Sequence, residues 1–153
     1  MTEPEVTRTR GVSSLAWGVA VNIHARAVRI WSLLTDAKNF PRWNSMVAGI
    51  EGQIRDGERL RLRVPGTDRT FTPRVTGVVP GERMIWAGGV APLFKGVRTF
   101  ELRPRNDGSV DFSMEERFSG LVLPLVKSSL PDFGPVFARF ASDLRTEAER
   151  ARA

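Results

Sequence analysis

Hydrophobic and polar residues alternate with period two over residues 12–23, which is typical of a β-strand with one buried face. One side of this segment carries the large apolar residues Leu15, Trp17, Val19, Val21 and Ile23. From residue 25 the apolar positions recur every three or four residues, so we predict a helix over 25–35. A shorter helix is predicted over 36–41, because Asp36 stands where an N-cap residue is favoured.

The middle of the chain reads as six further strands separated by turn signals. The predicted strands are 45–54, 58–64, 69–79, 82–87, 94–103 and 110–119. Gly, Pro-Gly and Asp-Gly pairs between them supply the backbone conformations that tight hairpins need. Short hairpin connections make neighbouring strands antiparallel.

The last segment, 133–150, has helical periodicity and is predicted to be the longest helix. Its apolar stripe is formed by Val136, Phe137, Phe140, Leu144 and Ala148. Charged residues, including Asp143 and Glu147, fall largely on the opposite side. A sheet with one face in water must bury the other face, so this helix is expected to lie across it.

Together the elements predict an α+β fold with one seven-stranded antiparallel sheet, two short helices after the first strand, and a long C-terminal helix. Residues 1–11 are polar and are predicted to form a loose tail in front of a single domain spanning 12–150. A chain of 153 residues is long enough for one such domain and its core.

The amino-acid composition excludes several kinds of functional site. The chain has no cysteine and one histidine, His24, which excludes disulfide scaffolds, thiol nucleophiles and multi-histidine metal sites. We therefore expect no metal and no cofactor. The net charge of +6 is spread along the chain without a block of like charges, so no nucleic-acid partner is predicted. No apolar run is long enough for a membrane span, and the polar N-terminus is unlike a secretory signal, so a cytoplasmic protein is expected.

Three stretches stand out within this order of elements. They are Phe40-Pro41-Arg42-Trp43-Asn44, Pro80-Gly81-Glu82-Arg83-Met84-Ile85-Trp86 and Glu116-Arg117-Phe118-Ser119-Gly120. Over residues 12–150 the chain resembles the helix-grip fold of the START-like, Bet v 1-like superfamily (SRPBCC), which includes polyketide cyclases and aromatases. The resemblance implies a curved sheet wrapped around the long helix, with a deep cavity between them. Members bind lipids, hormones, sterols or polyketides there, and some catalyse cyclisation or hydrolysis.

Strand phase predicts which side chains face that interior. In 94–103 the inward set includes Phe94, Gly96 and Phe100, with Arg98 as the one cation; in 110–119, Glu116 is the one anion among apolar residues. A short turn joins these strands, so Arg98 and Glu116 are expected to be neighbours. The pair has three readings: a buried ion pair that fills a polar gap, a group that orients a ligand, or a catalytic pair. In the last, Arg98 would hold an enolate oxygen and Glu116 would move a proton.

The candidate ligand-binding residues are the pair together with the inward aromatic, methionine and valine side chains. They are Trp17, Phe71, Val75, Met84, Trp86, Arg98, Phe100, Phe112, Met114, Glu116, Phe137 and Phe140. They predict a closed pocket of about 300–1,000 Å³ for a small hydrophobic molecule. The leading hypothesis is a carrier or sensor of such a molecule. The alternatives are a polyketide cyclase or aromatase acting in the same cavity and a module that binds a protein; whether the chain forms a homodimer is left open.

Overall fold

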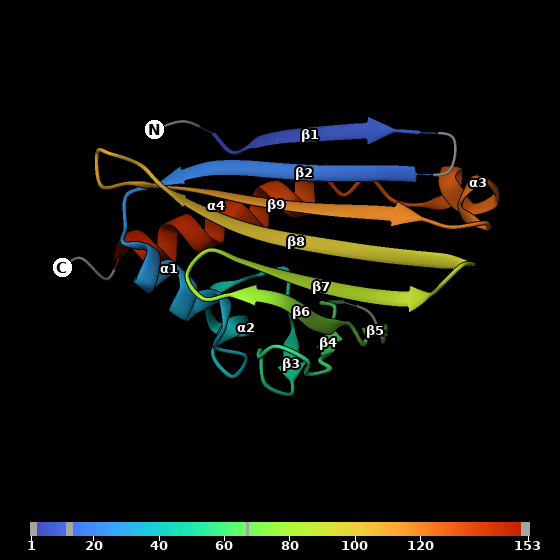
Figure 1. The fold of residues 1–153 in the computed structure, drawn as a ribbon, viewed down its shortest axis with the longest axis horizontal. Coiled ribbons are helices and arrows are strands. Elements are labelled where there is room, and N and C mark those ends of the chain that lie inside the picture. The colour runs from blue at the N-terminus through green and yellow to red at the C-terminus, as the bar shows by residue number, and fades with distance from the viewer. Residues whose placement is uncertain (1–2, 12–13, 67, 151–153) are drawn as a thin grey trace.

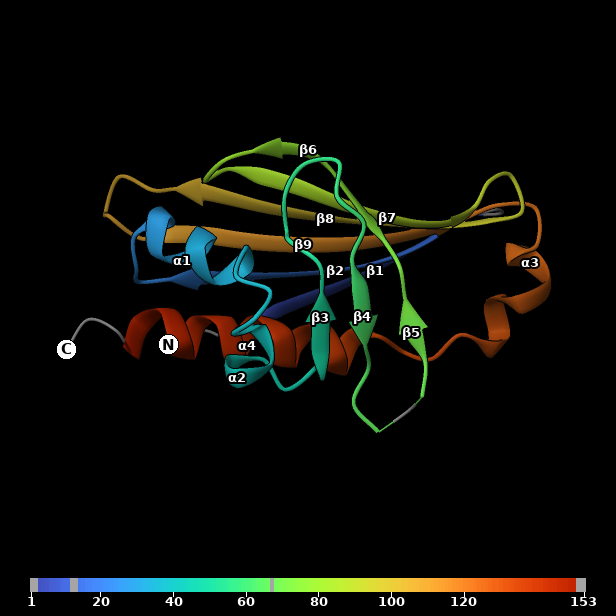
Figure 2. The same ribbon diagram turned by 90° about the horizontal axis from the view of Figure 1, so that it is seen from below.

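A six-stranded antiparallel sheet forms one layer of the computed structural model, which describes residues 3–11, 14–66 and 68–150 (Figure 1). Its strands, in spatial order, are β1 (Glu5–Arg10), β2 (Ser14–Ile23), β9 (Val110–Ser119), β8 (Phe94–Pro104), β7 (Arg83–Val90) and β6 (Arg74–Val79). A second sheet consists of β3 (Gly49–Glu51), β4 (Arg61–Arg63) and β5 (Thr70–Phe71). In Figure 2 its strands run from the level of the main sheet to the level of the C-terminal helix.

The α+β class and the helix across the sheet are confirmed, but the single seven-stranded sheet is wrong. The predicted strand 69–79 divides at Pro73, which has no N–H for a sheet hydrogen bond. Its first part pairs with β4 in the small sheet, and its second part pairs with β7 in the main sheet. The predicted strand 45–54 shrinks to β3, because Gly52 (φ +101°) turns the chain away.

The prediction of a loose tail at 1–11 is also wrong for its central residues. Glu5–Arg10 forms β1 and pairs antiparallel with β2 over its whole length. All six residues of β1 are exposed, so the strand carries no buried face and leaves no hydrophobic pattern in the sequence. Backbone hydrogen bonds, which any sequence without proline can make, hold it at the edge of the sheet.

The helices are α1 (Ala27–Leu34), α2 (Phe40–Trp43), α3 (Leu123–Val126), which a 3₁₀ turn (Lys127–Ser129) extends, and α4 (Gly134–Arg150). The two predicted short helices follow β2, which is the second strand. Asp36 does not cap α2: its carboxylate accepts hydrogen bonds from the backbone and side chain of Asn39 in the preceding turn. The longest helix is α4, as predicted, and it crosses one face of the main sheet (Figure 2). We call this face the inner face.

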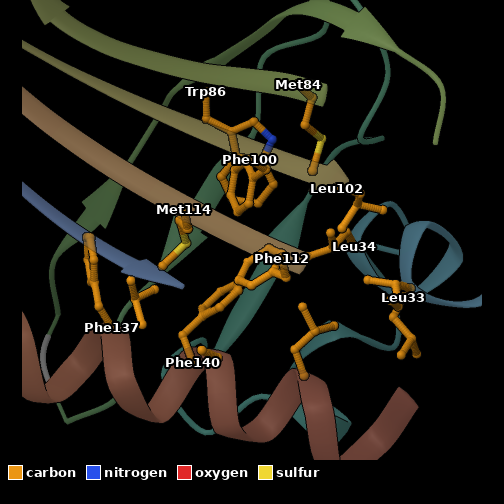
Figure 3. Packing of buried hydrophobic residues seen from close by; sticks show 14 of the residues in the cluster. Leu33, Leu34, Met84, Trp86, Phe100, Leu102, Phe112, Met114, Phe137 and Phe140 are labelled. Atoms are coloured by element: carbon orange, nitrogen blue, oxygen red, sulfur yellow. The ribbon is translucent and has the colours of Figure 1, made fainter. Parts of the chain in front are cut away.

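Aromatic side chains fill the space between the inner face and α4 near α1 and α2. Phe140 on α4 is 2% exposed, and its ring lies within 5.9–6.3 Å of four other rings, those of Phe40, Trp43, Phe100 and Phe112. Phe40 and Trp43 lie 4.6 Å apart, centroid to centroid, and close this end of the core. In Figure 3, Phe137 and Phe140 point from α4 towards the side chains of the sheet.

Candidate functional site

A row of four side chains crosses the inner face from strand to strand. Trp86 on β7 lies opposite Arg98 on β8, Arg98 lies opposite Glu116 on β9, and Glu116 lies opposite Trp17 on β2. Residues directly opposite one another in an antiparallel sheet point to the same face. Nε of Arg98 lies 3.5 Å from Oε2 of Glu116, which confirms that the two are neighbours. We call these four residues the polar row.

Arg98 also contacts the helix that covers the sheet. Its guanidinium carbon lies 5.3 Å from the ring centroid of Phe137 on α4, within the range of a cation–π contact. The Arg98 side chain keeps 23% of its surface exposed and that of Glu116 keeps 16%. The cation is therefore held between a carboxylate and an aromatic ring while one side of it still reaches solvent.

Three polar atoms of the row are buried without a hydrogen-bond partner: Nε1 of Trp17, Nε1 of Trp86 and Oε2 of Glu116. The 3.5 Å contact with Arg98 is an ion-pair distance, longer than a good N–H···O hydrogen bond. An unpartnered buried polar group costs about 1–3 kcal/mol. The row therefore offers two donors and one acceptor along which a polar group of a ligand would find a partner.

Burial raises the pKa of the Glu116 carboxyl above its ordinary value, and the nearby charge of Arg98 offsets this only in part. A carboxyl with a raised pKa holds its proton at a pH where an exposed glutamate has lost it. Glu116 can therefore donate or accept a hydrogen bond toward a ligand, depending on pH.

Further aromatic side chains continue from the polar row toward the end of the sheet where α3 lies. Phe133 lies 5.1 Å from Trp17 and 5.5 Å from Phe118, and Phe118 lies 5.7 Å from Phe94. Strand phase predicted that Phe94 and Phe118 face inward, but none of these three residues was among the predicted ligand-binding residues. Phe133 directly precedes α4 and stands four residues before Phe137, so its place at the start of the apolar stripe of 133–150 was the signal that could have found it.

Two glycines lie beside the row on the same face. Gly88 on β7 lies opposite Gly96 on β8, and Gly96 lies opposite Phe118. A methyl group at Gly96 would lie 3.5 Å from Oε1 of Glu116 and from the Phe118 ring, which is ordinary van der Waals contact. Room for a small group therefore exists directly next to the Arg98–Glu116 pair.

The predicted closed pocket is filled. Nine of the twelve predicted lining residues are at most 3% exposed, so their side chains are packed within the described part of the chain: Trp17, Val75, Met84, Trp86, Phe100, Phe112, Met114, Phe137 and Phe140. The Trp86 and Phe100 rings lie 4.8 Å apart, and Phe100 lies 6.2 Å from Phe140 (Figure 3). Long side chains from the sheet and from α4 meet each other and occupy the interior.

Hollows are found at the surface instead. An open groove of about 420 Å³ runs between β1 and the start of α4, where Arg8, Trp17 and Pro135 line it. A neighbouring groove of about 610 Å³ follows the outer side of α4 past Val136 and Arg139. Neither groove is lined by Arg98 or Glu116.

The prediction that Phe71 faces the interior is wrong. Phe71 belongs to β5 of the small sheet and is 54% exposed. The break at Pro73 separates it from Val75, which remains in the main sheet and is fully buried. The alternation of inward and outward side chains, which assumes one continuous strand over 69–79, therefore does not hold across Pro73.

Metal-ligating side chains do not gather anywhere in residues 3–11, 14–66 and 68–150: these contain no group of three or more His, Cys, Asp or Glu that would hold a metal ion. In the same residues no helix is both long and apolar enough to cross a membrane. The polar groups that the site itself offers are one guanidinium, one carboxyl and two indole N–H groups.

Comparisons with known proteins agree on one fold. A family model described as polyketide cyclase / dehydrase and lipid transport matches residues 14–150. Among solved structures, a START superfamily protein from Mycobacterium smegmatis is 20% identical, with a TM-score of 0.67 over 89% of this chain and 98% of that chain. A norcoclaurine synthase from Thalictrum is 15% identical, with a TM-score of 0.68 over 97% and 100%. DynU16, a putative protein in the dynemicin biosynthetic locus, is 18% identical, with a TM-score of 0.68 over 88% and 47%. No curated protein sequence matches.

Proposed function

Because this chain belongs to the polyketide cyclase / dehydrase and lipid transport family, within the START-like superfamily, we propose that it binds a small hydrophobic molecule that has one polar end. The binding domain spans residues 12–150, and the ligand lies between the inner face and α4. Its polar end contacts Arg98 and Glu116. A cytoplasmic location and the lack of a nucleic-acid partner stay predictions from the sequence.

The observation that carries this proposal is the set of unpartnered polar atoms in the polar row. Nε1 of Trp86 lies on the strand to one side of Arg98, and Oε2 of Glu116 and Nε1 of Trp17 lie on the strands to the other side of this partly exposed guanidinium. A carbonyl or carboxylate oxygen on the ligand would accept from a tryptophan N–H or from Arg98, and a hydroxyl would donate to Oε2 of Glu116. The surrounding rings of Phe118, Phe133 and Phe137 would cover an apolar body.

Entry is proposed at the end of the inner face that α3 flanks. The side chains at that end are only partly buried; they are Arg98, Glu116, Phe94 and Phe133. At the opposite end, Phe40 and Phe140 are buried. Binding then requires aromatic side chains near the row to move, because the interior is filled. Phe133, which lies in the segment leading into α4 and contacts Trp17, is the side chain expected to move first.

Gly96 offers a direct test of this position. We expect Gly96→Leu to weaken binding of the probe 1-anilinonaphthalene-8-sulfonate at least tenfold, because a leucine would occupy the space beside the Arg98–Glu116 pair. The probe has an apolar body and an anionic end that suits Arg98. Fluorescence titration measures the affinity, and native mass spectrometry counts bound molecules. The same method, applied to protein purified from its own host, identifies any retained ligand.

Gly96→Ala is the matched control. Its methyl group fits in ordinary contact, and replacing glycine where the backbone allows it stabilises a protein by about 0.4–1 kcal/mol. This variant should bind the probe as the unchanged protein does. One-to-one binding that survives Gly96→Leu at full affinity would contradict the proposed position, and no saturable binding by any of the three proteins would contradict the carrier function.

An enzyme of the polyketide cyclase or aromatase type is the second candidate, favoured by the raised pKa of Glu116 beside a cation. In its ionised form Glu116 would take a proton from the carbon between two carbonyl groups of a poly-β-ketone. The electrons of the broken C–H bond would pass to a carbonyl oxygen, and Arg98 would stabilise the resulting enolate. Cyclisation would follow by attack of the enolate carbon on another carbonyl of the same chain, and the alkoxide formed there would take the proton back from Glu116.

Glu116→Gln separates the two functions. If the protein is an enzyme, it should accelerate deuterium uptake at the carbon between the carbonyls of a β-ketoacyl thioester, as nuclear magnetic resonance measures. Glu116→Gln should then lower that rate about 10²–10⁴-fold, because the proton acceptor is lost, while the amide keeps the shape of the side chain and Arg98 still binds the anionic end of the probe. If the unchanged protein binds the thioester without accelerating the exchange, the carrier function stands and the enzyme is excluded.

A further inference from the structure

Exposed aliphatic side chains gather at the end of the molecule where the β7–β8 hairpin and α3 meet. Five of the ten large hydrophobic side chains that are exposed among the described residues lie in these two segments. We call them the apolar tip: Val90 (68% exposed), Leu93 (52%), Leu121 (71%), Leu125 (79%) and Val126 (36%). A cluster of this kind on a protein surface commonly marks an interaction site.

The two segments of the tip are joined by backbone hydrogen bonds. The N–H of Leu121 donates to the carbonyl of Pro92, and the N–H of Val122 donates to the carbonyl of Leu93, both at 3.0 Å. The Lys127 ammonium donates to the carbonyl of Gly11 and fastens the end of α3 to the β1–β2 connection. Figure 1 shows α3 and the β7–β8 turn at the same end of the sheet. The apolar side chains therefore belong to one fixed surface.

The charges at this end are mostly positive, and one of the cations, Arg117, forms an ion pair with Glu115 at 3.4 Å. Residues 10–15, 88–97 and 117–130 contain the cations Arg10, Lys95, Arg117 and Lys127 and no aspartate or glutamate. Lys95 is exposed and follows the tip by two residues. An aliphatic surface bordered mainly by cations is complementary to a lipid bilayer that has anionic headgroups.

We propose that the apolar tip docks on the surface of an anionic lipid bilayer and inserts its leucines and valines among the acyl chains. The inference rests on the proposed function, for which it supplies the source of the ligand. From Phe94 at the tip, β8 reaches Arg98 in four residues, about 13 Å. The rings of Phe94, Phe118 and Phe133 line that distance, so a lipid-like molecule leaving the bilayer would meet an apolar path to the polar row.

The composition of the tip favours a bilayer over a protein partner. Its exposed apolar side chains are all aliphatic and lie on two short protruding segments. Protein interfaces usually depend on tryptophan, tyrosine or arginine anchors in pockets, and neither groove described above is lined by residues of the tip. Aliphatic side chains on protruding turns insert into a bilayer without requiring a complementary shape.

Co-sedimentation with vesicles tests the proposal without any ligand. The full chain is mixed with vesicles of phosphatidylcholine alone or of three parts phosphatidylcholine to one part phosphatidylglycerol. We expect binding to the anionic vesicles that weakens as salt is added. The double variant Leu121→Ser, Leu125→Ser should weaken binding at least tenfold, and Lys95→Gln should weaken it about fivefold.

Matched controls lie at the opposite end of the molecule. Val28→Ser removes a valine on α1 that is 65% exposed, and Lys38→Gln removes an exposed lysine before α2. Neither should change vesicle binding. Equal losses from the controls and the tip variants, or no binding to anionic vesicles at all, would overturn the proposal.

Two further outcomes distinguish the neighbouring hypotheses. If the unchanged chain is a dimer in vesicle-free solution and the double leucine variant is a monomer, the tip is a protein interface and the bilayer proposal fails. Probe binding in vesicle-free buffer, measured on the same double variant, reports on the polar row alone. If the double variant still binds the probe but no longer binds vesicles, the tip docks on the bilayer. If the unchanged chain binds the probe but does not bind vesicles, the docking proposal is overturned and the carrier function remains.

Discussion

Phe140→Ala is expected to lower the free energy of unfolding by about 3–5 kcal/mol, because it removes a buried aromatic side chain and leaves a cavity. Phe140 is 2% exposed and contacts two rings from α2 and one from each of two strands of the main sheet. Those neighbours are themselves close-packed, so they are not free to close the gap. Urea unfolding followed by circular dichroism measures the change.

Val136→Ala on the same helix is the control for this variant. Val136 is 40% exposed, so its truncation should cost no more than about 0.5 kcal/mol. The comparison also reports on the state of the interior. A cost for Phe140→Ala close to that of the control would mean that Phe140 borders an open space in solution, contrary to the filled core described above.

Arg98→Met is expected to lower the free energy of unfolding by about 3 kcal/mol at neutral pH. Removing one partner of a largely buried ion pair leaves the other charge without compensation, which typically costs 3–5 kcal/mol. We place the effect at the lower end, since Arg98 and Glu116 keep 23% and 16% of their side-chain surface exposed. Methionine keeps most of the apolar contact that the arginine stem makes.

The cost of Arg98→Met should depend on pH with a defined sign. The pKa of Glu116 is raised in the folded state, so folding favours its protonated form. The stability linked to this group is therefore full below the ordinary pKa of 4.5 and is lost as pH rises through the folded pKa. Without Arg98 the folded pKa rises further, and the loss should continue to higher pH than in the unchanged protein. Urea unfolding at a series of pH values measures it.

The double variant Arg98→Met, Glu116→Leu is the control, because it removes both charges together. It should be more stable at neutral pH than Arg98→Met alone, and its own free energy of unfolding should lack the pH dependence due to Glu116. If the double variant folds but no longer binds the apolar probe, the pair serves the ligand. A single variant that is as stable as the unchanged protein at every pH would contradict the burial of the Glu116 carboxylate.

The sequence alone determined the inner face at the site. Strand phase has a period of two, so the positions of Arg98 and Glu116 among apolar residues placed both on the same face. The short turn at Asn106-Asp107-Gly108 then made their strands neighbours, and the structure brings the two side chains within 3.5 Å. The apolar stripe of 133–150 likewise identified the helix that covers this face.

Only the tertiary structure decided where elements without a buried face would lie. Hydrophobic patterns report which side of a segment is buried, and β1 buries neither side. Phe71 left the interior because Pro73 interrupted its strand, although its period matched that of Val75. Glu147 is the opposite case, a residue predicted to be exposed that is buried. The pattern placed it on the polar side of α4, yet it is 6% exposed, and Arg42 from α2 forms an ion pair with it at 2.8 Å.

The volume of the interior and the composition of the surface at the tip were also decided in three dimensions. A sequence gives the size of each inward side chain but not the distance between the sheet and α4, and that distance determines whether Trp86, Phe100 and Phe140 line a cavity or fill it. In the apolar tip, segments far apart in the chain are joined by backbone hydrogen bonds, from Leu121 N–H to the Pro92 carbonyl and from Val122 N–H to the Leu93 carbonyl. Sequence patterns carry information about burial within one segment, whereas these features depend on how segments approach one another.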